Sequence, residues 1–97
     1  MGATDTALAR LDRFLCTYPV RILKNQRIGN YVADYHCPLA GAVILLTNGK
    51  NDEARRMAFS AAGLTVLPVR RTAISKNLEG VLSYIDSTIK HALTNEA

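Results

Sequence analysis

The chain has 97 residues, of which 48% are hydrophobic and 21% are charged. This composition fits one small globular domain over residues 1–97 and excludes a disordered, collagen-like or coiled-coil protein. The net charge of +4 at pH 7 is compatible with a nucleic acid or an acidic partner but requires neither.

The sequence shows neither a membrane-spanning segment nor a secretory signal. The longest uncharged apolar run, residues 39–46, is far shorter than the ~20 residues of a membrane-spanning helix. Residues 1–13 carry charges among their apolar residues and have no secretory apolar core. We therefore expect a cytoplasmic protein with no membrane partner. Cys16 and Cys37 fit no zinc-binding spacing, and we expect both as free thiols, with Cys37 buried.

The first half of the chain predicts a helix and three strands, over residues 4–16, 20–25, 31–36 and 42–47. The helix has leucines on one face and ends before Pro19. A turn at Gly29-Asn30 joins the first two strands. In the second strand, Asp34 and His36 share one face because side chains alternate along a strand. The third strand is an unbroken apolar run, which is typical of a strand covered on both faces.

The second half predicts a helix, a strand and a final helix, over residues 52–62, 64–69 and 78–93. Asn51 is expected as the N-cap of the first helix and Gly63 as its C′ residue. A single crossover helix makes the strands on either side of it parallel. The predicted fold is therefore α/β, in the order α-β-β-β-α-β-α, with a mixed four-stranded sheet flanked by helices. The final helix is more apolar than a small sheet requires, which leaves homodimerisation through this helix or an edge strand open.

Four segments of the chain carry a family resemblance. They are IGNYVADYHCP at residues 28–38, ILLTNG at 44–49, DEAR and GLTVL at 52–55 and 63–67, and NLEGVL at 77–82. These segments resemble a bacterial family of small endonuclease-like domains related to the very-short-patch-repair (Vsr) endonucleases. That family belongs to the PD-(D/E)xK, or restriction-endonuclease-like, superfamily. The resemblance implies a restriction-endonuclease-like fold and a DNA-associated function.

The resemblance also implies hydrolysis of phosphodiester bonds with a bound Mg²⁺, which activates water and takes hard oxygen ligands. Asp34 matches the family's first acid, and His36 is a candidate for a phosphate contact or a proton transfer. The family's next two acidic positions are Leu46, which offers no ligand, and Asn48, which keeps a carbonyl oxygen without the charge. One carboxylate remains where such a site generally uses two or more, so we expect a degenerate active site.

The sequence therefore favours a catalytically degenerate endonuclease-like domain that needs no cofactor. We expect it to be retained as a nucleic-acid-associated or protein-interaction module. The alternative is an active metal-dependent DNA endonuclease, in which Asp34 and either Asp52 or Glu53 hold Mg²⁺. A third hypothesis is an oligomeric scaffold with no nucleic-acid function.

Two groups of basic residues are expected to flank the strand ends and to neutralise DNA phosphates without reading sequence. They are Lys50, Arg55, Arg56, Arg70, Arg71 and Lys76. The alternative is an ordinary solvated surface. The four tyrosines are too few and too scattered to predict stacking on single-stranded nucleic acid.

The candidate acids also have structural explanations. Asp34 is explained by an ion pair with Lys24, Arg55 or His36. Asp52 is explained by its place in the first turn of a helix, where the helix dipole favours a negative charge.

Overall fold

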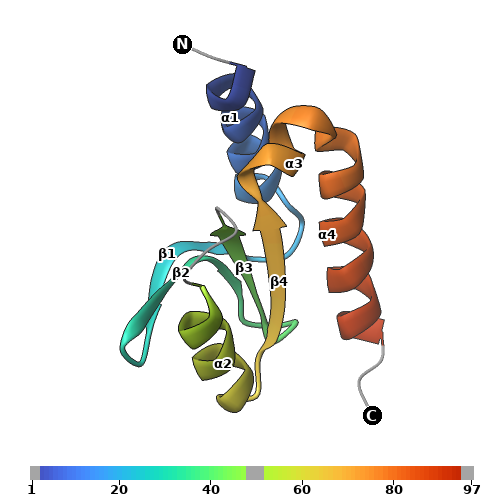
Figure 1. The fold of residues 1–97 in the computed structure, drawn as a ribbon. Helices are drawn as coiled ribbons and strands as arrows, with labels where there is room; N and C mark the ends of the chain where they lie inside the picture. The colour runs from blue at the N-terminus through green and yellow to red at the C-terminus, as the bar shows by residue number, and fades with distance from the viewer. Residues whose placement is uncertain (1–2, 48–51, 95–97) are drawn as a thin grey trace.

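The computed structural model describes residues 3–47 and 52–94, without the side chains of residues 3–5. A single sheet lies between two layers of helices (Figure 1). The elements follow in the order α1 (Ala3–Cys16), β1 (Leu23–Ile28), β2 (Tyr31–Cys37), β3 (Ala42–Thr47), α2 (Glu53–Ala61), β4 (Thr65–Arg70), α3 (Arg71–Lys76) and α4 (Leu78–Thr94). The predicted α/β class is confirmed.

The sheet has the strand order β1-β2-β3-β4. The pairs β1–β2 and β2–β3 are antiparallel, whereas β3 and β4 are parallel because α2 returns the chain between them. The β3–β4 register runs from Ala42↔Thr65 to Thr47↔Arg70, so these two strands end at the same edge of the sheet. The predicted mixed sheet is confirmed. The candidate site lies near the edge at which β3 and β4 both end.

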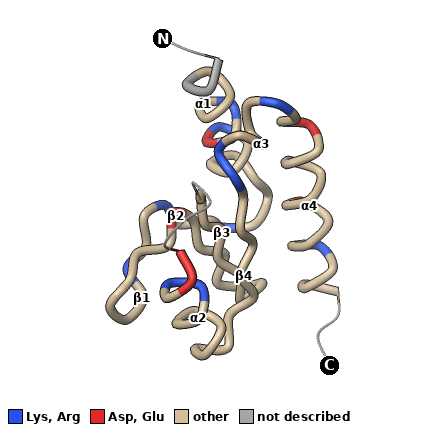
Figure 2. The backbone as a smooth tube through the Cα atoms, viewed as in Figure 1, with Lys and Arg blue, Asp and Glu red and all other residues tan. Residues whose placement is uncertain are grey.

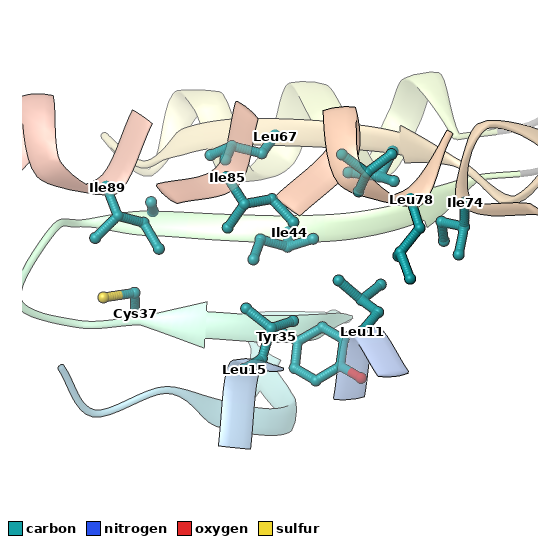
Figure 3. Close-up of a cluster of buried hydrophobic side chains, with 13 residues drawn as sticks. Leu11, Leu15, Tyr35, Cys37, Ile44, Leu67, Ile74, Leu78, Ile85 and Ile89 are labelled. Carbon is teal, nitrogen blue, oxygen red and sulfur yellow. The ribbon is translucent and has the colours of Figure 1, made fainter. Parts of the chain in front are cut away.

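Helices α1, α3 and α4 cover one face of the sheet, and α2 covers the other (Figure 1). In the larger core cluster, Ile44 of β3 is buried together with Leu11 of α1 and Ile85 of α4 (Figure 3). In the smaller cluster, Val43 of β3 is buried with Phe59 of α2. Successive residues of β3 thus belong to opposite clusters, which confirms a strand covered on both faces.

The end of α2 follows from one glycine. Gly63 has a φ of 86°, a conformation that side chains other than glycine rarely adopt. Its N–H donates to the carbonyl of Ser60 at 3.0 Å, and the N–H of Leu64 donates to the carbonyl of Phe59 at 3.1 Å. These two bonds form a Schellman motif, so the predicted C′ glycine is confirmed.

The start of α2 differs from the expectation. Asp52 occupies the N-cap position, and the N–H of Arg56 donates to its carbonyl at 2.9 Å. The prediction of Asn51 as the N-cap is therefore wrong, and Asn51 itself lies outside the described residues. The Asp52 side chain forms no cap hydrogen bond, because its carboxylate pairs with an arginine that is described below.

Two further elements differ from the sequence-based expectation. The predicted strand at residues 20–25 is displaced: β1 begins at Leu23 and ends at Ile28. As an edge strand it exposes several polar side chains, so hydrophobic pattern alone places it poorly. Helix α3 is not predicted at all, because its six residues are too few for a helical stripe and only Ile74 among them is buried.

Within residues 3–47 and 52–94, no helix combines the length and apolar character that a membrane crossing requires. Both cysteines are free. Cys16 is exposed on α1, and Cys37 is buried at the end of β2, as expected.

Candidate functional site

Asp34 lies in β2, directly beyond the last pair of the β2–β3 register, Tyr35↔Ile44. Its Oδ2 accepts a hydrogen bond from the backbone N–H of Leu46 in β3 at 2.8 Å. The carboxylate thus satisfies a strand N–H that a backbone carbonyl would otherwise have to satisfy. Asp34 therefore has a structural function at the point where β2 and β3 part.

Arg55 on α2 joins Asp34 to Asp52. Its Nη2 lies 2.9 Å from Oδ1 of Asp52, and its Nη1 lies 3.8 Å from Oδ2 of Asp34. Nη1 also donates to the backbone carbonyl of Val32 at 3.1 Å. The side chains of Arg55, Asp34 and Asp52 are 21%, 25% and 22% exposed, so this bridge is largely shielded from water. We call Asp34, Arg55 and Asp52 the bridged cluster.

The bridged cluster settles which structural explanation of Asp34 holds. Of the three partners considered for it, Arg55 is the one that it contacts. Lys24 instead pairs with Asp12, at 2.9 Å.

The acids also do not gather into a metal site: across the described ranges, 3–47 and 52–94, there is no group of three or more His, Cys, Asp or Glu side chains that could hold a metal ion.

The donor set of the bridged cluster does not fit a Mg²⁺ ion. Asp34 and Asp52 supply carboxylates, but a guanidinium already neutralises both and hydrogen-bonds one of them. Mg²⁺ requires oxygen ligands in near-octahedral geometry, and the positive charge of Arg55 opposes a second cation at the same place. Glu53 does not compensate, because its side chain is 76% exposed and pairs with Arg56 at 3.8 Å.

Leu46 meets Asp34 through its backbone rather than its side chain. The side chain of Leu46 packs against the larger core cluster, on the face covered by α1, α3 and α4. Arg55 and the smaller cluster lie on the opposite face. A carboxylate at this position would therefore not simply point at Asp34. Asn48 and Lys50, the other substituted position and a proposed phosphate ligand, lie outside the described residues.

His36 is on β2, two residues after Asp34, and is only partly exposed. Its Nδ1 is buried without a hydrogen-bond partner. Burial lowers the pKa of the imidazole below its ordinary value, because the charged form loses its solvation. No hydrogen bond or ion pair joins it to another described residue, so its candidacy for proton transfer stays a prediction without a positioned partner.

Of the six predicted basic residues, the five that the structure describes lie on α2 and around α3 (Figure 2). Arg55 and Arg56 are on α2, and each is paired with an acid. Arg70 ends β4, and Arg71 begins α3. Lys76 ends α3 and lines the same shallow depression on this helix as Arg71.

Arg70, Arg71 and Lys76 form no ion pair with any other residue in the described part of the chain. We call these three residues the α3 basic cluster. It lies at the carboxyl edge of β4, where its charges are not neutralised from within the domain. Within this cluster, Arg71 and Lys76 line one depression on α3, whereas Arg70 lines a separate groove beside α4.

A second polar cluster was not predicted from the sequence. Asp12 of α1 accepts a hydrogen bond from the Tyr35 hydroxyl at 2.8 Å and pairs with Lys24 at 2.9 Å. The hydrogen bond from Lys24, which has the largest effect, and the one from Tyr35 hold the pKa of Asp12 below its ordinary value. The cluster joins α1 to β1 and β2. No local sequence motif predicts it, because its members are far apart in the chain.

The chain matches no known protein-family model, and no curated protein is significantly similar to it. The resemblance to endonuclease-like domains therefore stays a prediction that rests on the motifs quoted above.

Proposed function

We propose that this chain is a catalytically degenerate endonuclease-like domain that binds the phosphate backbone of nucleic acid through the α3 basic cluster. The observation that carries the proposal is a contrast in pairing. The guanidinium of Arg55 has two carboxylate partners, whereas Arg70, Arg71 and Lys76 have none among the described residues.

The loss of catalysis is supported by the chemistry of the bridged cluster. A metal-dependent nuclease needs a divalent ion to activate water and to neutralise charge on the phosphate. Here the two nearest carboxylates are held by Arg55, and one of them also fixes the N–H of Leu46. Recruiting Asp34 and Asp52 as ligands would require breaking contacts that hold α2 to the sheet.

Backbone binding is supported by the position of the free cations. Arg70, Arg71 and Lys76 lie within one short stretch, at the end of a strand and along a helix. Lysine and arginine side chains that neutralise phosphates release condensed counterions, which supplies affinity without reading sequence. The net charge of +4 favours the same encounter at long range.

The test is the affinity for a short DNA duplex, measured by fluorescence anisotropy from 50 to 200 mM salt. We expect the double variant Arg70→Ala/Arg71→Ala to bind about tenfold more weakly and to lose about 0.9 of the salt slope per phosphate contact removed. Arg56→Ala is the matched control, because it removes an arginine that is paired with Glu53. Wild-type affinity in the double variant, or no binding by the wild-type protein to either the duplex or its single strand, would reject the proposal.

The active-endonuclease alternative is tested by a plasmid-nicking assay with Mg²⁺ and Mn²⁺. Asp34→Asn is the informative variant, because an amide oxygen can still accept the Leu46 N–H while the charge is lost. We expect neither the wild-type protein nor the variant to nick DNA. Cleavage by the wild-type protein that disappears in Asp34→Asn would establish the enzyme instead.

A further inference from the structure

A groove of about 330 Å³ is lined by Arg70, one of the three residues of the α3 basic cluster. Its walls come from the end of β4, from α3 and from the first turns of α4. Pro68 and Val69, together with Ala73 and Val81, give it apolar surface, while Arg70 and Tyr84 also line it. An unpaired cation, Arg70, and an aromatic ring, Tyr84, therefore line the same groove.

The start of α4 positions this ring. Asn77 caps the helix: its Oδ1 accepts a hydrogen bond from the N–H of Gly80 at 3.1 Å. Gly80 has no side chain, and a Cβ there would collide with the side chain of Asn77. Tyr84 follows one turn later on the same side of the helix, where both residues line the groove.

Tyr84 differs from two other tyrosines of the domain. The hydroxyls of Tyr18 and Tyr35 each donate to a carboxylate, of Asp86 at 2.6 Å and of Asp12 at 2.8 Å. Tyr84 is 45% exposed, and its hydroxyl has no hydrogen bond to another described residue. Neither core packing nor a hydrogen bond explains an aromatic ring at this position.

We infer that this groove binds a base of single-stranded nucleic acid, stacked on Tyr84, while an adjoining phosphate contacts Arg70 of the α3 basic cluster. The inference rests on the proposed backbone binding and specifies its substrate. A cationic surface next to an exposed aromatic ring is the combination that binds unpaired strands. The groove is at the small end of the range for ligand pockets, and a base that is paired inside a duplex does not present its face to a protein ring.

The charges on the two sides of α4 indicate on which side of this helix a nucleic-acid strand would bind. On the other flank, a second groove is lined by Glu79 and Asp86 together with Phe14 and Tyr18. Glu79 and Asp86 each pair with a basic side chain, Arg10 at 4.0 Å and Lys90 at 3.1 Å. Among the described residues, this groove therefore offers a phosphate no unpaired cation, whereas the Tyr84 groove contains Arg70 and no acid. A polyanionic strand that reaches α4 is therefore favoured on the Tyr84 side.

The test compares a labelled 12-nucleotide single strand with the duplex of the same sequence, using the wild-type protein, Tyr84→Leu and Tyr84→Phe. Loss of one stacked base costs about 1–3 kcal/mol, so we expect Tyr84→Leu to weaken single-strand binding about 5- to 150-fold. Tyr84→Phe keeps the ring and should bind within about twofold of wild type. Leu39→Ala, which removes another exposed apolar side chain, is the matched control.

The two proposals fail in different ways. If the wild-type protein binds neither oligonucleotide, backbone binding fails. If Arg70→Ala/Arg71→Ala weakens binding but Tyr84→Leu binds the single strand like wild type, only the stacking inference is overturned. A second readout needs no variant: on addition of the single strand, NMR signals of the Tyr84 ring should shift upfield while those of the buried Tyr35 ring stay unchanged. Unshifted Tyr84 signals at saturation would also overturn the inference.

Discussion

The guanidinium groups of the domain lie in contrasting surroundings, which is clear when Arg55 on α2 is compared with Arg70 and Arg71 at the junction of β4 and α3. The guanidinium of Arg55 bridges Asp34 and Asp52 and donates to a strand carbonyl, with 21% of its side chain exposed. Arg70 is exposed at the end of β4, and neither it nor Arg71 pairs with an acid of the described chain. The first arginine holds the fold together, and the other two are free to bind a ligand.

The comparison shows why positive charge alone does not identify a binding surface. An arginine whose charge is already neutralised within the protein would have to lose those contacts before it could bind a phosphate. An unpaired arginine has no such cost. Mutation of the paired arginine should therefore lower the stability of the protein, whereas mutation of the unpaired arginines should weaken ligand binding.

The largest effect is expected for Arg55→Ala. The variant leaves Asp34 and Asp52 without a counter-charge in a largely shielded place and removes the donor to the Val32 carbonyl. We expect the free energy of unfolding to fall by about 2–3 kcal/mol, measured by urea denaturation. Arg56→Ala, on the same helix with a side chain that is 49% exposed, should change it by less than about 0.5 kcal/mol. Equal stability of the two variants would refute the bridging function of Arg55.

A smaller effect is expected at the other carboxylate cluster, where Tyr35→Phe removes the hydroxyl that donates to Asp12. We expect a loss of about 1 kcal/mol at pH 7. Because its partners lower the pKa of Asp12 below the ordinary 3.8, the stabilisation is present above that pH and is lost as the pH falls through the lowered value. The difference between Tyr35→Phe and wild type should therefore shrink on acidification below about pH 4, and a difference that grows there would contradict this origin.

The smallest effect concerns His36, which shares β2 with Asp34 but has no charged partner among the described residues. Burial lowers its pKa below the ordinary 6.5, so below that pH the unfolded chain binds more protons than the folded protein. The free energy of unfolding should fall as the pH is lowered from 7 through 6.5, and His36→Gln should remove this dependence. His91→Gln, on the exposed side of α4, is the control. An unchanged slope in His36→Gln would assign the dependence to other groups.

The elements that the sequence predicted well are those with a strong local pattern. The apolar run of β3, the stripe of α4 and the glycine at position 63 each determine their structure within a few neighbouring residues. β1 and α3 were misplaced or missed because one is a polar edge strand and the other is too short to show a period. Local pattern is sufficient where an element buries apolar residues in a regular run or stripe, and it is insufficient at the margins of the fold.

The candidate site was less predictable for a different reason. Arg55 was one of three partners considered for Asp34, and only the packing of α2 on the sheet selects it. The bond from the Leu46 N–H depends on where β2 and β3 part, and the Tyr84 groove depends on the placement of α4 beside β4. These contacts join residues that are distant in sequence, so no local motif contains them.

The most direct test of the central claim follows the side-chain Nε–H signals of the arginines by NMR while a DNA duplex is added at low salt. We expect the signals of Arg70 and Arg71 to shift with increasing DNA. The signal of Arg55, whose Nε is buried, should not move. A shift of the Arg55 signal with Arg70 and Arg71 unchanged would place the ligand at the bridged cluster and contradict the account.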